Sequence, residues 1–69
     1  MTAGTPKFET LNAAMDWTRH NAVVYADGRL YAAQAGIGGS VFREHGTSRG
    51  WAVELLAQTL HRKFGKATP

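Results

Sequence analysis

Residues 22–34, AVVYADGRLYAAQ, constrain the fold more than any other stretch of the chain. They form two short apolar runs joined by Asp27-Gly28, and Asp-Gly between alternating apolar residues is the strongest short-range signal for a β-hairpin. The reason is that a type I′ turn needs a positive φ at both central residues. The sequence therefore predicts a hairpin with Asp27-Gly28 as its two-residue loop. In that register the cross-strand pairs are Ala26–Arg29, Tyr25–Leu30, Val24–Tyr31 and Val23–Ala32.

Both faces of the predicted hairpin are apolar. Because side chains alternate along a strand, one face includes Val23 and Tyr25, and the other includes Val24 and Tyr31. A two-stranded ribbon alone is marginal in water, so at least one face must pack on helices. The face with Val24 and Tyr31 then needs a cover as well, which a second copy of the chain, the second helix or a protein partner could each supply. We expect a second copy or a target to be found there.

Helical patterns flank the hairpin on both sides. The first helix is predicted to begin after Thr10, a residue type that caps helix N-termini, and to end at Asn21 in a left-handed conformation. The second is predicted to run from residue 49 or 50 to residue 64, between a hydroxyl cap at residue 47 or 48 and Gly65. Its apolar arc is wider than one small hairpin can cover.

The segment between the hairpin and the second helix is rich in glycine and has the weakest pattern. Residues 40–45 could form a third short strand, with Val41 and Arg43 on one face and Phe42 and Glu44 on the other, and the sequence leaves this open. The predicted fold class is therefore α+β, in the order helix, β-hairpin, possible third strand, helix.

The small size of the chain indicates that it gains stability from self-association. Sixty-nine residues make one domain, residues 1–69, with residues 1–7 as a frayed lead-in. A domain of this length is marginal, and the absence of cysteine excludes disulfides and thiolate metal sites. We therefore expect a homodimer. The residues predicted to form its interface are Val24, Trp51, Leu55 and Leu56.

Charge and hydropathy limit the location and the partners. Eight basic residues against five acidic ones give a net charge of +3, which suits an acidic protein or nucleic acid. No apolar run approaches the length of a membrane span, so no membrane insertion is expected. The N-terminus lacks the pattern of a signal peptide, and the expected location is the cytoplasm.

No catalytic or cofactor motif is present in the sequence. Residues 36–40, GIGGS, resemble a phosphate-cradling loop but lack the Gly-Lys-Ser/Thr of a P-loop, so a flexible connection is favoured. The histidines His20, His45 and His61 show no metal-binding spacing. His45 has no evident acid to orient it and no oxyanion hole. We expect a protein that is not an enzyme and has no catalytic, cofactor or metal site.

Aromatic and arginine residues around the hairpin and the following segment have the composition of a protein interface. Nucleic-acid binding is less favoured, because a hairpin separates the helices and the basic residues form no stripe. The residues predicted to contact a protein partner are Tyr31, Phe42, Arg43, His45 and Arg49.

The length, the Asp27-Gly28-Arg29 hairpin and the closing helix together resemble the small early proteins of bacteriophages. Among these the chain resembles the quorum-sensing anti-activators of Pseudomonas phages. The resemblance covers overall length and the order of elements, and it assigns no binding residue. It implies a homodimer that binds a LuxR-type transcription activator and a type IV pilus assembly ATPase.

The expected function is therefore that of a phage-encoded, non-enzymatic inhibitor that binds a host regulatory protein in the host cytoplasm. Two alternatives stay open. Phage anti-CRISPR proteins share the same outward description, and a small basic DNA-binding accessory protein has the same charge.

Overall fold

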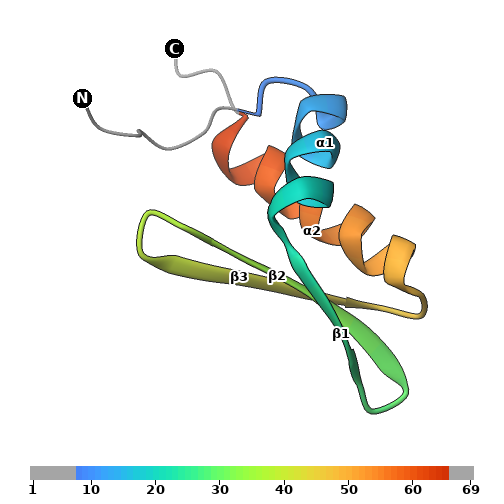
Figure 1. Ribbon diagram of the computed structural model, residues 1–69. Helices are drawn as coiled ribbons and strands as arrows, with labels where there is room; N and C mark the ends of the chain where they lie inside the picture. Colours follow the sequence, from blue (N-terminus) through green and yellow to red (C-terminus); the bar gives the residue numbers. More distant parts are fainter. Residues whose placement is uncertain (1–7, 66–69) are drawn as a thin grey trace.

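The computed structural model describes residues 8–65 and contains two helices and one antiparallel sheet of three strands (Figure 1). The strand order is β1-β2-β3. Helix α2 lies along one face of the sheet, and α1 packs against α2 on the same side (Figure 1). The predicted α+β class and the third strand are confirmed. The elements are α1 (Leu11–Asn21), β1 (Val23–Asp27), β2 (Leu30–Ile37), β3 (Ser40–Gly46) and α2 (Arg49–Phe64).

The first hairpin exists, but its predicted register is wrong. Asp27 pairs with Leu30, so the two-residue loop is Gly28-Arg29 rather than Asp27-Gly28. Gly28 has a φ of +67°, and among residues 8–65 no residue other than glycine has a positive φ. A turn with glycine at its first central position needs a positive φ only there, whereas the predicted loop would need one at Asp27 as well. The observed pairs include Val24–Ala33 and Tyr25–Ala32.

The glycine-rich segment is a second tight hairpin. Gly38 and Gly39 have φ values of +59° and +84°, and they connect Ile37 directly to its partner Ser40. Two consecutive positive φ angles are typical of a type I′ turn. The flexible connection predicted here is therefore wrong, and these glycines hold β2 and β3 in register.

The core lies between α2 and the face of the sheet that includes Val24, Tyr31 and Ala33. Ala33 and Ala35 of β2 are buried beneath Leu56 and Leu60 of α2, both of which are fully buried. Small side chains on β2 allow the helix to approach the sheet closely. Of the three covers left open for this face, the chain's own second helix is the one observed. The expectation that a second copy or a target would be found there is therefore wrong.

An aromatic cluster joins the two ends of the described chain to the sheet. Phe8 is buried and packs against Trp17 of α1, with 5.3 Å between ring centroids, and against Phe64 of α2. Phe64 in turn packs edge-on against Phe42 of β3 at 5.6 Å. Edge-to-face pairs of this kind contribute about 0.5–1.5 kcal/mol each beyond their buried area.

The predicted caps are confirmed at both helix starts. Thr10 and Ser48 have extended backbones, and each side-chain oxygen accepts a hydrogen bond from a first-turn N–H at 3.1 Å. The helices end at Asn21 and Phe64 as predicted, but the backbone conformations there differ from the left-handed caps expected of Asn21 and Gly65. Asn21 is helical, and Ala22 after it is extended. Gly65 has a φ of −90°, so it is not a left-handed cap.

No helix within residues 8–65 is long and apolar enough to cross a membrane.

Candidate functional site

The face of the sheet opposite α2, which we call the outer face, presents the second set of alternating side chains. Two of its valines are widely exposed, Val23 by 64% and Val41 by 62%, and Leu30 is exposed by 38%. These three are the only strand residues among the large exposed hydrophobic side chains in the described part of the chain. The outer face consists of Val23, Tyr25, Asp27, Leu30, Ala32, Gln34, Gly36, Val41, Arg43 and His45.

A hydrogen-bonded ladder crosses all three strands on the outer face. The side-chain oxygen of Gln34 in β2 accepts a bond from the Tyr25 hydroxyl in β1 at 3.1 Å. The same oxygen accepts a bond from the Arg43 Nε in β3 at 2.9 Å. One amide oxygen therefore holds both neighbours, and the guanidinium and the phenol have restricted positions before any ligand arrives.

A second cross-strand contact pairs a histidine with a carboxylate. The Nε2 of His45 lies 2.8 Å from Oδ2 of Asp27, and both side chains are partly exposed. Ala32 lies between its register partners Tyr25 and His45 and is fully buried. No acid was predicted to orient His45, because the expected register placed Asp27 in the loop.

A histidine oriented by an aspartate can act as a general base in nucleophilic catalysis, but only when a nucleophile lies within hydrogen-bond distance of the histidine. Within residues 8–65, no serine, threonine or tyrosine hydroxyl is hydrogen-bonded to His45. The contact therefore serves to hold two side chains of the outer face in place. Residues 8–65 contain no group of three or more potential metal ligands.

The five residues predicted to contact a partner do not lie on one surface. Arg43 and His45 belong to the outer face. Tyr31 and Phe42 lie on the helix-facing side, where the Arg49 guanidinium stacks 5.1 Å from the Tyr31 ring. A partner contact by Phe42 needs an exposed side chain, but Phe42 is half-buried in β3 against the core.

The predicted dimer residues are also divided by the fold. Leu56 is fully buried inside the chain, so its assignment to an interface is wrong. Val24 packs against the core of its own chain. Trp51 is exposed by 44% and Leu55 is half-buried, so these two residues of α2 are the ones that stay accessible.

A shallow hollow of about 490 Å³ lies where α1, β1 and the start of α2 meet. Arg19 of α1 and Arg49 of α2 both line it, and Glu54 is the acidic residue there. Its apolar lining comes from Met15, Val24 and Val53, and Gly50 completes it. The shared position of Arg19 and Arg49 could not be predicted from the sequence, because they are thirty residues apart and line the same hollow only through the packing of the helices.

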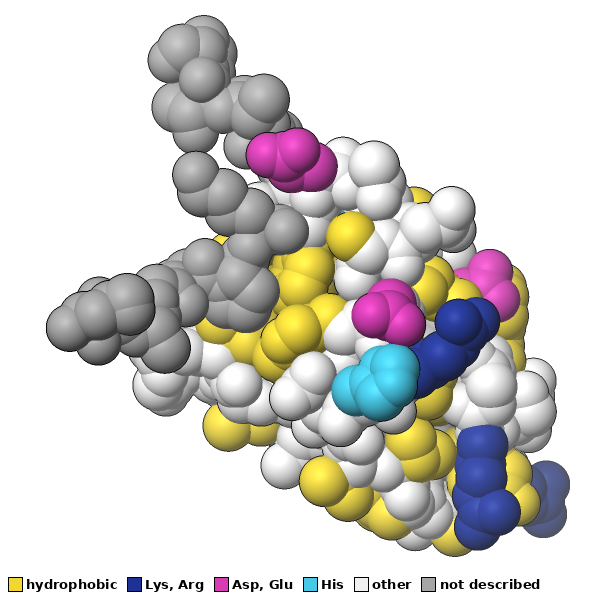
Figure 2. Space-filling view, turned by 45° about the horizontal axis from the view of Figure 1, so that its top comes forward, with side chains coloured by type: hydrophobic (Ala, Val, Ile, Leu, Met, Phe, Trp, Pro, Cys, Tyr) yellow, Lys and Arg dark blue, Asp and Glu magenta, His cyan; other side chains and the backbone are white. Residues whose placement is uncertain are grey.

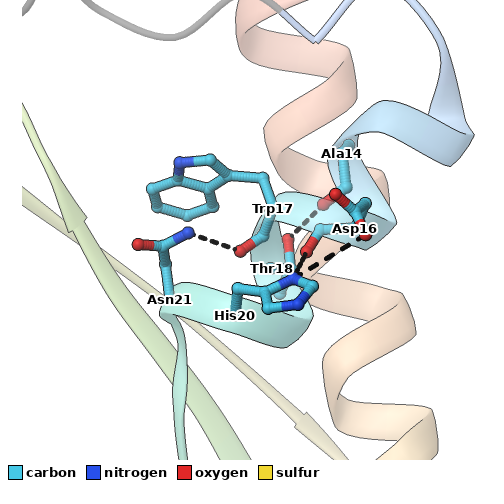
Figure 3. Close-up of polar contacts among 6 residues, drawn as sticks. All are labelled: Ala14, Asp16, Trp17, Thr18, His20 and Asn21. Atoms are coloured by element: carbon cyan, nitrogen blue, oxygen red, sulfur yellow. Dashed lines mark hydrogen bonds and ion pairs between the residues drawn. The ribbon is translucent and has the colours of Figure 1, made fainter.

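The polar side chains of α1 are used within the helix itself (Figure 3). The hydroxyl of the buried Thr18 donates to the carbonyl of Ala14 at 2.6 Å, and Asn21 Nδ2 donates to the carbonyl of Trp17 at 2.8 Å. His20 Nδ1 lies 2.7 Å from the carbonyl oxygen of Asp16. These contacts run one turn back along the helix, as Figure 3 shows, and they assemble no site.

The outer face is therefore the best-organised exposed surface of the described chain. Comparison with protein-family models, curated proteins and solved structures finds no match to this chain.

Proposed function

We propose that this protein is not an enzyme and that it acts by binding another protein through the outer face of its sheet. The observation that supports this function is the concentration of exposed apolar side chains, Val23, Leu30 and Val41, on the sheet face that α2 leaves open. Exposed apolar groups surrounded by polar side chains are typical of protein interaction sites.

The organisation of the polar groups supports the same proposal. Tyr25, Gln34 and Arg43 are already hydrogen-bonded to one another, and His45 contacts Asp27. Ordering a flexible side chain costs about 0.5–1.5 kcal/mol on binding, and side chains already held in place avoid part of that cost. Tyrosine and arginine are also the residue types that contribute most at protein interfaces.

For the partner, we propose a bacterial regulatory protein, and specifically a LuxR-type transcription activator, which the protein would inhibit as a phage-encoded homodimer. This choice follows the resemblance to phage anti-activators in length and order of elements. An anti-CRISPR role uses the same kind of surface on a different target. Binding measurements against each of the two target proteins distinguish the anti-activator role from the anti-CRISPR role.

The test measures binding of the purified protein to a purified LuxR-type activator and, separately, to a CRISPR effector complex. The variant Val23→Thr/Val41→Thr keeps the β-branched shape of both side chains and replaces one methyl of each by a hydroxyl. At about 0.8 kcal/mol per buried methyl, the two changes together weaken binding roughly tenfold.

Leu11→Gln is the matched control, since Leu11 is an exposed apolar residue of α1 away from the outer face. We expect it to bind as the unmodified protein does. Binding to the effector complex alone would replace the regulator by the anti-CRISPR alternative. Equal binding by the double-threonine variant would exclude the outer face as the contact surface.

A second candidate function, binding to a nucleic-acid backbone, is favoured by one observation: Arg19 and Arg49 line the same hollow. Against it, residues 8–65 contain six basic and five acidic side chains, a near balance. On the side seen in Figure 2, the Lys and Arg side chains lie in separate groups rather than in one stripe.

Salt dependence tests this second candidate. If the arginines contact phosphates, affinity for duplex DNA or RNA falls steeply with salt, and Arg19→Gln/Arg49→Gln lowers the slope of log affinity against log salt by roughly two. Arg62→Gln, an exposed change near the end of α2, is the control. A chain that binds neither duplex at low salt does not have this function.

A further inference from the structure

The outer face has a gap in its layer of side chains at Gly36. Gly36 pairs with Val41 on β3, and the next outward-facing position on β2 is Gln34, which pairs with Val23 and Arg43. A Cβ built on Gly36 would have a single neighbour within 4 Å, the carbonyl oxygen of Ser40 at 3.7 Å. Backbone therefore forms the surface at this point, between the two most exposed valines of the sheet.

The charge beside this gap has no counter-charge. The Arg43 Nε is bonded to the neutral amide oxygen of Gln34, and within residues 8–65 no carboxylate lies within 4.0 Å of the Arg43 guanidinium. Its neighbour Glu44 is on the other face, where it accepts a bond from Thr59. The terminal amino groups of Arg43 make no hydrogen bond in the described part of the chain.

We propose that the Gly36 gap and Arg43 together form the anchor subsite for the partner, and that this subsite takes an aspartate or glutamate side chain flanked by apolar residues. This inference rests on the proposed function and names the chemistry that the outer face recognises. The carboxylate pairs with the free edge of the guanidinium, and the flanking apolar groups contact Val23 and Val41.

The choice of a carboxylate follows from the planar, forked geometry of the Arg43 guanidinium. A guanidinium matches a carboxylate with two parallel hydrogen bonds, and this match is lost with a lysine ammonium. An exposed pair alone contributes little, but apolar contacts around it exclude water and strengthen it. The two exposed valines provide such contacts.

A protein segment is favoured over a nucleic-acid phosphate at this subsite. The exposed valines suit apolar side chains, and the outer face also includes the carboxylate of Asp27, which would repel a polyanion. A single carboxylate within an apolar sequence fits both features.

The test is selection from a random peptide library displayed on phage, with the full-length protein as the bait. The unmodified protein is expected to enrich peptides with an Asp or Glu next to apolar residues. Arg43→Gln and Arg43→Lys should lose the acidic preference, and a synthetic enriched peptide should bind each of them about tenfold more weakly. Arg62→Gln is the control for a general loss of positive charge.

A second variant fills the gap without disturbing the sheet. Gly36→Val adds a side chain that favours strands, at a position where a Cβ makes only an ordinary van der Waals contact. The Tm is therefore expected to be unchanged or slightly higher. The same variant should bind the enriched peptide at least tenfold more weakly, because the valine occupies the space of the ligand.

The outcomes separate the two proposals. Suppose that the enriched peptides lose binding to Val23→Thr/Val41→Thr, which places them on the outer face, but contain no acidic residue. If they also bind Arg43→Gln and Gly36→Val as tightly as the unmodified protein, the subsite is wrong and the proposed function stands. If the library yields no peptide, or only peptides that ignore the double-threonine variant, the outer face is not the binding surface and both proposals fail.

Discussion

At the scale of single residues, two glycines of this protein are required by close approach rather than by backbone conformation. Gly65 has a φ of −90°, which other residues adopt freely, yet a Cβ there would overlap the carbonyl oxygen of Phe8. That oxygen also accepts a bond from His61 Nδ1 at 2.8 Å. Gly46 has a similar constraint, since its Cβ would lie 2.6 Å from the backbone N of Ala52.

We predict that Gly65→Ala destabilises the protein by about 2 kcal/mol, because the methyl group displaces Phe8 from its packed position. For a domain of this size, that corresponds to a fall in Tm of roughly 8–16 °C. Gly50→Ala, in the first turn of the helix that Gly65 follows, is the control, since its Cβ meets nothing within 4 Å. It should raise the free energy of unfolding by about 0.5–1 kcal/mol. Differential scanning calorimetry measures both. Equal Tm values for the two variants would show that Phe8 does not depend on the glycine.

At the scale of elements, the first hairpin shows that the sequence predicts the presence of a turn but not its type or register. Asp27-Gly28 predicts a hairpin correctly, yet the register depends on whether Gly28 is the first or the second central residue of the turn. The observed shift is two residues along β2, so the composition of each face is unchanged. For this reason, the grouping of Val23 with Tyr25 on one face and of Val24 with Tyr31 on the other is correct despite the incorrect pairing.

The role of Gly28 can be checked by substitution. Gly28→Ala places a Cβ on a residue with a φ of +67°, which costs about 1–2 kcal/mol for an L-residue even though space is available. Gly36→Ala is the control, because Gly36 lies in β2 outside the β1 pairing and has an ordinary φ. It should lower the free energy of unfolding by no more than about 0.5 kcal/mol or raise it. Urea unfolding curves compare the two, and a similar loss in both would contradict the assigned turn.

At the scale of the whole molecule, the outcome depends on which side of the sheet the second helix covers. Both faces are apolar enough to be a core, and the sequence offered no decisive reason to choose between them. In the fold, α2 packs over the alanines of β2, and Leu56 and Leu60 fill the space above them. The outer face then remains open, and its surface is built from residues that lie on three strands.

The homodimer expected from the small size of the chain stays a prediction. Its interface cannot include Leu56, which is inside the fold, whereas Trp51 remains exposed on the same helix. The apolar arc of α2 that suggested self-association is largely used by the sheet and by α1. The argument for a dimer now depends on the marginal stability expected of so short a chain.

The sequence by itself determined the fold class, the two helices and the cap at Thr10. It left the cap of the second helix open between Thr47 and Ser48, and it offered the third strand only as a possibility. The features that it determined depend on interactions between residues near one another in the chain, such as a hydroxyl with a first-turn N–H. The tertiary structure alone decided the register of the first hairpin, the covered face of the sheet and the contacts among Tyr25, Gln34, Arg43, Asp27 and His45. Those features depend on differences in free energy between alternative arrangements of distant segments. One such difference is between two turn types in the first hairpin, and another is between the two apolar faces that could pack beneath α2.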